Sequence, residues 1–217
     1  MENLPPEMLA VLTGFLSGLL SSIPVGPVNL TILNEGARRG LVWALLIGLG
    51  ATFMEALYCG LAFTGFASFF SRGIIKMIME LGSIAFLLYL GVRFVRARSI
   101  ETASKVELRI EEKLHPHSAF MIGFVRVMGN PGVLLYWIVL AAIFVRREWV
   151  EPTLSSKLSC IAGVAGGTFL WFASLSYAVS CAHRKFTQKT LLRMERFSGF
   201  GLIGLALVNA VQIILKL

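Results

Sequence analysis

The sequence contains no aspartate, and only 15% of its 217 residues are charged. It has three cysteines but no Cys-x-x-Cys pair, which argues against a thiol-disulfide electron carrier. It has no glycine-rich phosphate loop and no nucleophile elbow, and its three histidines lack acids at ligand spacing. We therefore expect neither an enzyme nor a bound metal or other cofactor.

Apolar residues dominate instead, because 56% of the chain is hydrophobic and its mean hydropathy is +0.77. About 20 apolar residues suffice to cross a bilayer as a helix, and six runs reach that length, the third only by including Arg93. The runs are 8–34, 41–71, 77–92, 118–145, 158–182 and 197–215. We predict an all-α integral membrane protein with six transmembrane helices, surrounded by the lipid bilayer.

The charges at the ends of these runs predict an orientation. Residues 1–7 carry two acids and no basic side chain, unlike a secretory signal peptide, so the first run is expected to stay in the protein. The loops on one side hold 13 Lys and Arg residues and those on the other side 6. By the positive-inside rule both termini lie outside. This distribution also explains the net charge of +8 without a nucleic-acid partner.

The chain reads as a single transmembrane transporter domain made of two halves, 8–96 and 118–217, joined by a charged cytoplasmic linker at 97–117. Three helices in each half would give the halves opposite orientations, so we predict a 3+3 inverted repeat. Gly50-Ala51-Thr52-Phe53 in the second run resembles Gly166-Gly167-Thr168-Phe169 in the fifth, which supports shared ancestry of the halves.

Helix-breaking residues interrupt the first and fourth runs, at 23–27 and 129–132. Proline frees backbone groups that lipid cannot satisfy, so such breaks survive only inside protein or beside a polar cavity, and paired breaks mark binding sites in transporters. The predicted substrate path comprises Pro24, Gly26, Pro27 and Asn29 at the first break and Asn130 and Pro131 at the second. In the alternative interpretation, the prolines only kink the helix and the hydroxyls of Ser21 and Ser22 bond back to it.

Two ionisable residues within the runs stand out. Glu55 falls near mid-membrane depth, where apolar surroundings favour the neutral carboxyl, so it is our candidate for proton coupling. The alternative is a carboxyl that only bonds another helix. Arg126 lies five residues before Pro131, and we include it in the substrate path, where it would pair with Glu55 or a substrate carboxylate. The alternative is that it reaches back to the headgroups.

Several segments resemble the lysine-exporter (LysE-type) translocator family. The matching segments are Pro24-Val25-Gly26-Pro27, residues 35–41, Gly48 and Gly50 with the acid at 55, residues 87–91, Gly123-Phe124 and Asn130-Pro131. The resemblance implies a six-helix exporter of amino acids or similar small solutes in the inner membrane, driven by the proton gradient. The chain also departs from the family pattern, with Glu55 where members usually carry Asp and Gly132 where a Lys often follows.

On this interpretation the partners are protons and an amino-acid-like solute, and the two halves alternate access while Glu55 exchanges a proton. A homodimer is left open. A divalent-cation exporter is the main alternative, but hard cations need several oxygen ligands and Glu55 is the only acid expected at depth. A non-transporting membrane scaffold is the other alternative, and it predicts that Glu55 and both breaks are dispensable.

Overall fold

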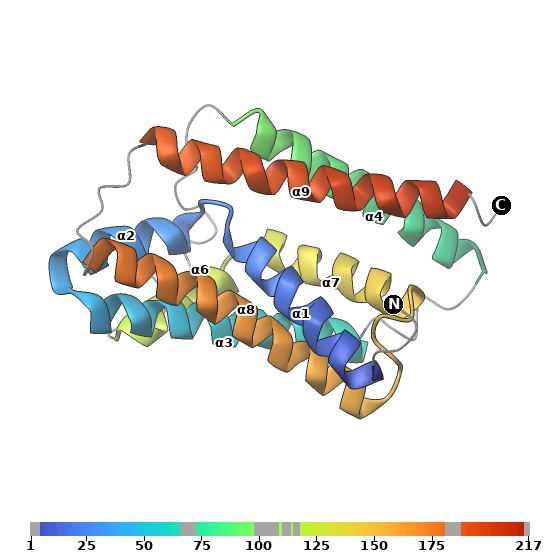
Figure 1. Cartoon of the computed structure of the whole chain (residues 1–217), viewed down its shortest axis with the longest axis horizontal. Coiled ribbons are helices and arrows are strands. Elements are labelled where there is room, and N and C mark those ends of the chain that lie inside the picture. Colours follow the sequence, from blue (N-terminus) through green and yellow to red (C-terminus); the bar gives the residue numbers. More distant parts are fainter. Residues whose placement is uncertain are drawn as a thin grey trace.

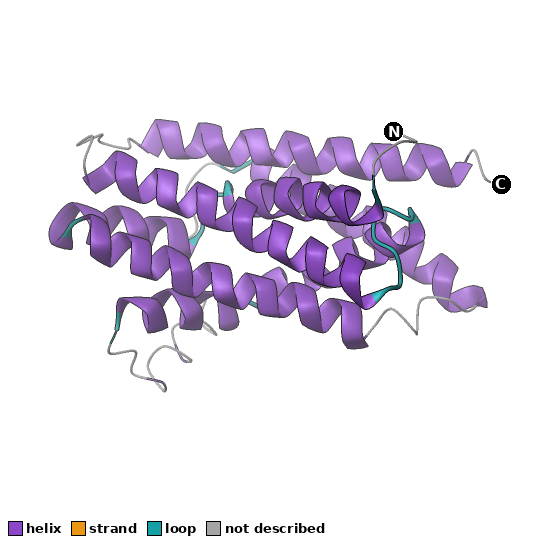
Figure 2. Cartoon of the chain, turned by 60° about the horizontal axis from the view of Figure 1, so that its bottom comes forward, coloured by secondary structure: helices purple, strands orange, loops and turns teal. Residues whose placement is uncertain are grey.

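A computed structural model describes residues 5–65, 73–97, 109, 114, 118–180 and 188–214. Within these residues all regular structure is α-helical, which confirms the predicted class (Figure 2). The helices are α1 (Pro6–Ser22), α2 (Pro27–Arg39), α3 (Leu41–Gly65), α4 (Gly73–Val95), α6 (Ala119–Met128), α7 (Pro131–Arg146), α8 (Leu154–Ser180) and α9 (Gln188–Ile214). Apart from residues 97, 109 and 114, the predicted linker lies outside the described residues, as does Cys181.

At each of the two predicted helix breaks, one helix ends and another begins. The chain bends by 72° between α1 and α2 and by 68° between α6 and α7. Pro27 and Pro131 are the first residues of α2 and α7, a position that suits proline because the first amides of a helix have no partner within it. The first and fourth runs are therefore pairs of half-helices.

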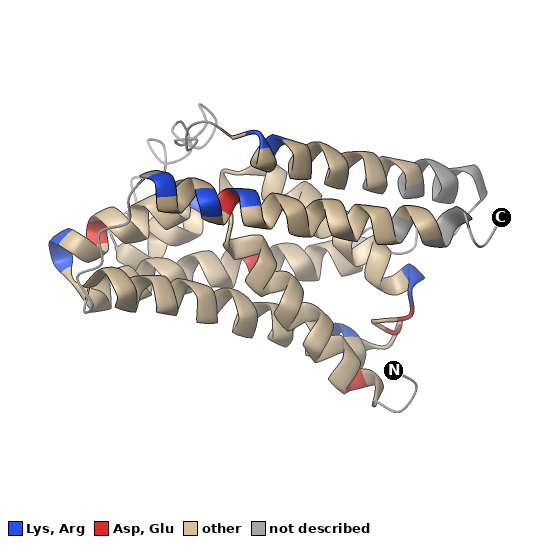
Figure 3. Cartoon of the chain, turned by 45° about the horizontal axis from the view of Figure 1, so that its top comes forward, with Lys and Arg blue, Asp and Glu red and all other residues tan. Residues whose placement is uncertain are grey.

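Among the described residues, α3 and α8 are each long and apolar enough to cross a membrane, and each bent pair can form one further span. This gives two to four spans by length and composition. Lys and Arg lie mainly toward the ends of the helices and leave long uncharged stretches, as Figure 3 shows. The chain is therefore a membrane protein, whereas six spans remain a prediction that depends on α4 and α9.

The beginning of the last helix corrects the sequence prediction. The apolar pattern places the sixth run at 197–215, with the charged residues before it in a loop, but α9 begins at Gln188. Arg193, Glu195 and Arg196 therefore lie on the helix. Figure 1 shows α9 and α4 side by side along one edge of the molecule.

Close contacts between backbones join the two halves of the chain. α1 packs along α8, and α3 packs along α6. A Cβ atom on Gly123 of α6 would overlap the carbonyl oxygen of Ile47, and one on Gly50 of α3 would overlap that of Phe120. Gly18 of α1 has the same relation to α8. Small residues allow membrane helices to approach this closely and gain dispersion contacts along their length.

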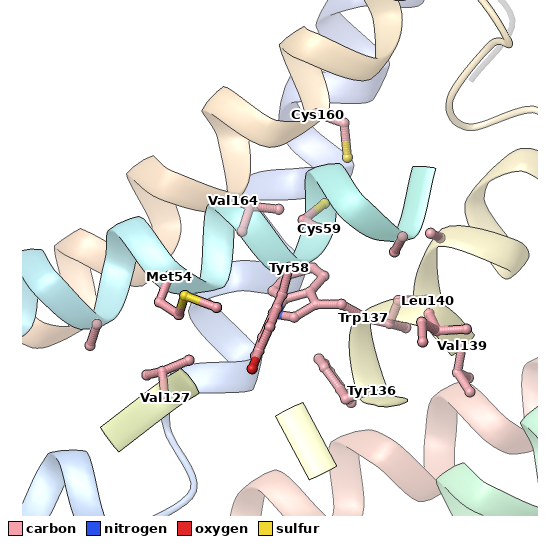
Figure 4. Packing of buried hydrophobic residues seen from close by; sticks show 14 of the residues in the cluster. Met54, Tyr58, Cys59, Val127, Tyr136, Trp137, Val139, Leu140, Cys160 and Val164 are labelled. Carbon is pink, nitrogen blue, oxygen red and sulfur yellow. The ribbon is translucent and has the colours of Figure 1, made fainter. Parts of the chain in front are cut away.

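Large apolar side chains fill the space around α3, α7 and α8. Trp137, Phe63, Phe144, Ile32 and Leu140 are among the largest buried side chains. In Figure 4, Tyr58, Tyr136 and Trp137 gather between α3 and α7. These side chains pack α3 against α7.

Candidate functional site

The two breaks meet at one cavity of about 460 Å³, which also reaches α4 and α9. Every residue of the predicted path lines it, together with Glu55 and Arg126. The path residues are Pro24, Gly26, Pro27, Asn29, Asn130 and Pro131. The structure thus gathers all eight candidates around one space, while their use in binding remains a prediction.

Glu55 is buried on α3, with only 5% of its surface exposed. The hydroxyl of Ser21, at the end of α1, lies 3.1 Å from its Oε2 atom. Tyr136 and Trp137 of α7 pack nearby and are themselves buried. The carboxyl therefore lies at the cavity wall, in contact with the end of α1 and with aromatic side chains of α7 nearby.

Glu195 of α9 is a second buried acid at the same cavity, with 5% of its surface exposed. The sequence predicts Glu55 as the only acid at depth, whereas this cavity holds two buried acids. The sequence did contain a signal, because Leu191, Ser198 and Leu202 follow a helical spacing around Glu195 and are buried with it. Extending the helical pattern across the charged residues would have found it.

Two arginines complete the charged lining, Arg93 from α4 and Arg126 from α6. Arg126 is half-buried and lies at the cavity. This position places its guanidinium where it can bind a carboxylate through two hydrogen bonds. The described part of the lining thus carries two acids and two guanidinium groups, a balance suited to a solute with both charges.

Asn29 holds the first break in shape. Its amide nitrogen donates to the carbonyl oxygens of Ser22 at 2.9 Å and Pro24 at 2.7 Å, and its Oδ1 accepts from the indole of Trp171 at 3.1 Å. Both amide protons are therefore engaged with the backbone that the break frees. We assign Asn29 to shaping the path, whereas the prediction gave it only a place along that path.

The hydroxyls near this break bond back to the helices, as the kink interpretation proposed. Ser21 and Ser22 each lie 2.8 Å from the Gly18 carbonyl oxygen, and Thr31 donates to the Pro27 carbonyl at 2.7 Å. The bend of 72° nevertheless separates two distinct helices. The two interpretations therefore each describe part of the structure.

The second break is also satisfied by side chains. Asn130 caps α7, because its Oδ1 accepts from the Gly132 amide at 3.0 Å. Tyr58 of α3 donates to the Met128 carbonyl oxygen at 2.8 Å, at the end of α6. Carbonyl ends at both breaks are thus bonded by neighbouring side chains.

The half-helix N-termini face the cavity as well. The first residues of both α2 and α7 line it, and α2 has no side-chain cap among the residues described. Helix N-termini carry partial positive charge and bind anions. Asn29 and Tyr58 bond carbonyl oxygens at the C-terminal ends of α1 and α6, which lie at the same two breaks.

Asn29→Ala is expected to destabilise the protein strongly. It leaves the Ser22 and Pro24 carbonyl oxygens without their hydrogen-bond donor, and each unsatisfied buried group lowers the free energy of unfolding by about 1–3 kcal/mol. Asn34→Ala is the matched control, because Asn34 is an exposed residue of the same helix. Thermal unfolding of the detergent-solubilised variants provides the measurement, and equal stability of the two would contradict the assigned role of Asn29.

The segment 35–41 spans the end of α2, the linking residue Gly40 and the first residue of α3. Glu35 lies 2.9 Å from Arg39 in an ion pair, and Arg39 stacks over Trp43 with 4.8 Å to the ring centroid. Gly40 adopts a φ of 88°, a left-handed conformation that glycine accepts without steric cost. This segment therefore shapes a turn away from the cavity, and the described residues contain no group of three or more metal-ligating side chains.

Comparison with known proteins gives one family and several relatives. The family model described as LysE type translocator matches residues 19–212. YcgF of Bacillus subtilis (strain 168), named as a candidate amino acid efflux protein, is 23% identical over 187 residues, which cover 86% of this chain and 88% of YcgF. No solved structure matches the chain.

Two further relatives carry different names. The arginine exporter protein ArgO of Serratia proteamaculans (strain 568) is 27% identical over 202 residues, with 79% of this chain and 97% of ArgO covered. The chemotactic transduction protein ChpE of Pseudomonas aeruginosa PAO1 is 26% identical over 166 residues, with 76% of this chain and 79% of ChpE covered.

Proposed function

Because the chain belongs to the LysE type translocator family, whose members are membrane transporters rather than enzymes, we propose that it exports amino acids or similar small solutes across the inner membrane. The observation that carries the proposal is the cavity that both helix breaks share with buried acids and arginines. The names of YcgF and ArgO, amino acid efflux protein and arginine exporter, support the same substrate class.

The substrate's carboxylate binds beside Arg126. Arg126 offers a bidentate partner, and the N-termini of α2 and α7 add their partial charges. The substrate's ammonium group binds the acids, Glu55 and Glu195. Both charges of a zwitterion thereby find a partner where a bare ion would be costly in the membrane.

Export is coupled to protons through Glu55. An ammonium group favours the ionised carboxyl, while a proton neutralises it, so substrate and proton compete for one group. A proton arriving from outside then releases the substrate outward and returns with the carrier. Burial of Glu55 beside the cavity supports this role, because a solvated carboxyl would stay ionised at neutral pH.

The two halves alternate access by rocking around the cavity. Similar bends of 72° and 68° and the pairing of α1 with α8 and α6 with α3 support an inverted repeat, since exchanging the halves exchanges these pairs. The similar segments at 50–53 and 166–169 support the same repeat, although the glycine that contacts the neighbouring backbone is shifted by one position between them. Gly50 makes the close contact in α3 and Gly167 makes it in α8.

Efflux from proteoliposomes under an imposed proton gradient tests the proposal. Labelled amino acids and divalent cations are loaded one at a time into proteoliposomes. At least one amino acid should leave faster than it leaves protein-free liposomes. Movement of a divalent cation alone would favour the cation-exporter alternative. Failure of every solute to move would contradict the assigned substrate class.

Arg126→Gln is expected to weaken substrate binding by tenfold or more, because a charge-assisted bond to a carboxylate is worth about 1.5–3 kcal/mol. Arg38→Gln is the control, since Arg38 is 75% exposed at the turn between α2 and α3. The quantity to compare is the concentration of the transported amino acid at which the efflux rate is half its maximum. Equal values in the two variants would remove Arg126 from the binding site.

A further inference from the structure

We infer that the Ser21 hydroxyl is a positioning switch that transmits the protonation of Glu55 to the contact between α1 and α8. The inference rests on the proposed proton coupling and adds how the proton acts on the helices. Ser21 lies where α1 ends at the first break, and it contacts both the carboxyl and the backbone.

One hydroxyl here serves two acceptors. Ser21 Oγ lies 2.8 Å from the Gly18 carbonyl oxygen and 3.1 Å from Oε2 of Glu55. A serine hydroxyl carries one proton, so it can donate fully to only one of them. Which acceptor it serves depends on whether Glu55 already carries a proton.

An ionised Glu55 can only accept, so it draws the Ser21 proton away from the Gly18 carbonyl oxygen. A protonated Glu55 can donate its own proton to Ser21 Oγ, and the Ser21 proton then returns to the Gly18 carbonyl oxygen. The hydroxyl only rotates between these states. The single proton gained or lost belongs to the Glu55 carboxyl throughout.

The Gly18 carbonyl oxygen has further donors. Ser22 Oγ lies 2.8 Å from it, and Thr168 Oγ1 of α8 lies 3.3 Å from it. The Ser22 amide donates to this oxygen within α1, so the three hydroxyls compete for the one lone pair that the helical bond leaves. When Ser21 turns to an ionised Glu55, one competitor is removed, and the Thr168 bond that joins α1 to α8 becomes stronger. When Glu55 is protonated, Thr168 has the longest and weakest bond and is displaced first.

This contact is well placed to alter the packing of the halves. A Cβ atom on Gly18 would overlap the Val164 carbonyl oxygen of α8, so the two backbones touch beside Thr168. α1 belongs to the first half and α8 to the second. A change in this bond therefore acts where the halves meet, a few residues before the break.

Other ionisable groups lie on the helices around Glu55. They are Tyr58 and Cys59 of α3, Arg93 of α4, Arg126 of α6, Tyr136 of α7, Cys160 of α8 and Glu195 of α9. Ser21 differs from them because it contacts both the carboxyl and the α1 backbone. Its neighbour Ser22 supplies a matched control, since Ser22 bonds the same Gly18 carbonyl oxygen.

The test follows the infrared band of the protonated Glu55 carboxyl against pH, with the band identified by its loss in Glu55→Gln. Ser21→Ala should shift the titration midpoint by about half to one pH unit, which corresponds to one hydrogen bond. Ser22→Ala should leave it within about 0.3 unit. Ser21→Thr, which keeps the hydroxyl, should restore the wild-type midpoint and also serves if Ser21→Ala folds poorly.

The pH profile of efflux should shift with the band in Ser21→Ala and stay unchanged in Ser22→Ala. A Glu55 band that titrates identically in wild type and Ser21→Ala would overturn the switch and leave proton coupling intact. Absence of any titrating Glu55 band in the wild type, together with efflux that ignores the proton gradient, would overturn proton coupling and the switch with it.

Discussion

Glu55→Gln is expected to abolish proton-driven efflux and to retain exchange of substrate across the membrane at a higher half-saturating concentration, because Glu195 remains to bind the ammonium group. Glutamine keeps the size of the side chain and an acceptor for Ser21, so the fold and the cavity should survive. It cannot bind or release a proton. If Glu55 is the group for which substrate and proton compete, the proton gradient can no longer drive transport by the variant. The substrate-bound protein can still change between its inward-open and outward-open states.

Two assays on the same proteoliposomes separate these effects. Gradient-driven efflux should fall to the level of protein-free liposomes. Exchange of labelled for unlabelled substrate, with the same pH on both sides of the membrane, should continue. Glu7→Gln is the control, because Glu7 is exposed in the first turn of α1. Efflux by Glu55→Gln that still responds to the gradient would assign Glu55 a purely structural role and leave coupling to another group.

Gly123→Ala is expected to cause the largest loss of stability among the single-methyl changes considered. The added Cβ would overlap the Ile47 carbonyl oxygen and lie 3.0 Å from the Ala51 nitrogen, both of which are backbone atoms of α3. Backbone cannot rotate away as a side chain can, so α6 and α3 must separate. Overpacking commonly costs about 1–3 kcal/mol, and a rigid neighbour places this change at the upper end or beyond.

Gly204→Ala provides the matched change. Among the described residues, no atom lies within 4 Å of the position that an added methyl group on Gly204 of α9 would occupy. Alanine there should therefore be neutral or gain up to about 1 kcal/mol of helix propensity. Thermal unfolding followed by size-exclusion chromatography compares the two variants. If both substitutions raise the melting temperature, the result would contradict the close backbone contact between α3 and α6.

The sequence was most informative where local chemistry decides the structure. Pro27 and Pro131 cannot continue a helix from the preceding turn, so both breaks could be located before any fold was known. The apolar runs that became α3 and α8 were equally clear, because a long uncharged stretch has few alternatives to a membrane helix. Glu55 was conspicuous for the same reason.

Features that depend on which helices meet were harder to find. Glu195 was missed because the charges around it hide the beginning of α9, and only burial against the cavity distinguishes it from its exposed neighbours Arg193 and Arg196. Asn29 was placed on the path, but its bonds to Ser22 and Pro24 follow from the angle of the break.

The amino-acid sequence by itself determined the class of this protein, its two helix breaks and the acid at the centre of its second apolar run. These follow from the cost of charge and unpaired backbone in lipid, which acts on each segment separately. Only the tertiary structure decided that both breaks, Glu55, Glu195 and Arg126 share one cavity, and that Ser21 contacts Glu55. Helix rotation and pairing set those contacts, and they depend on glycines fitting against distant backbone rather than on any local pattern.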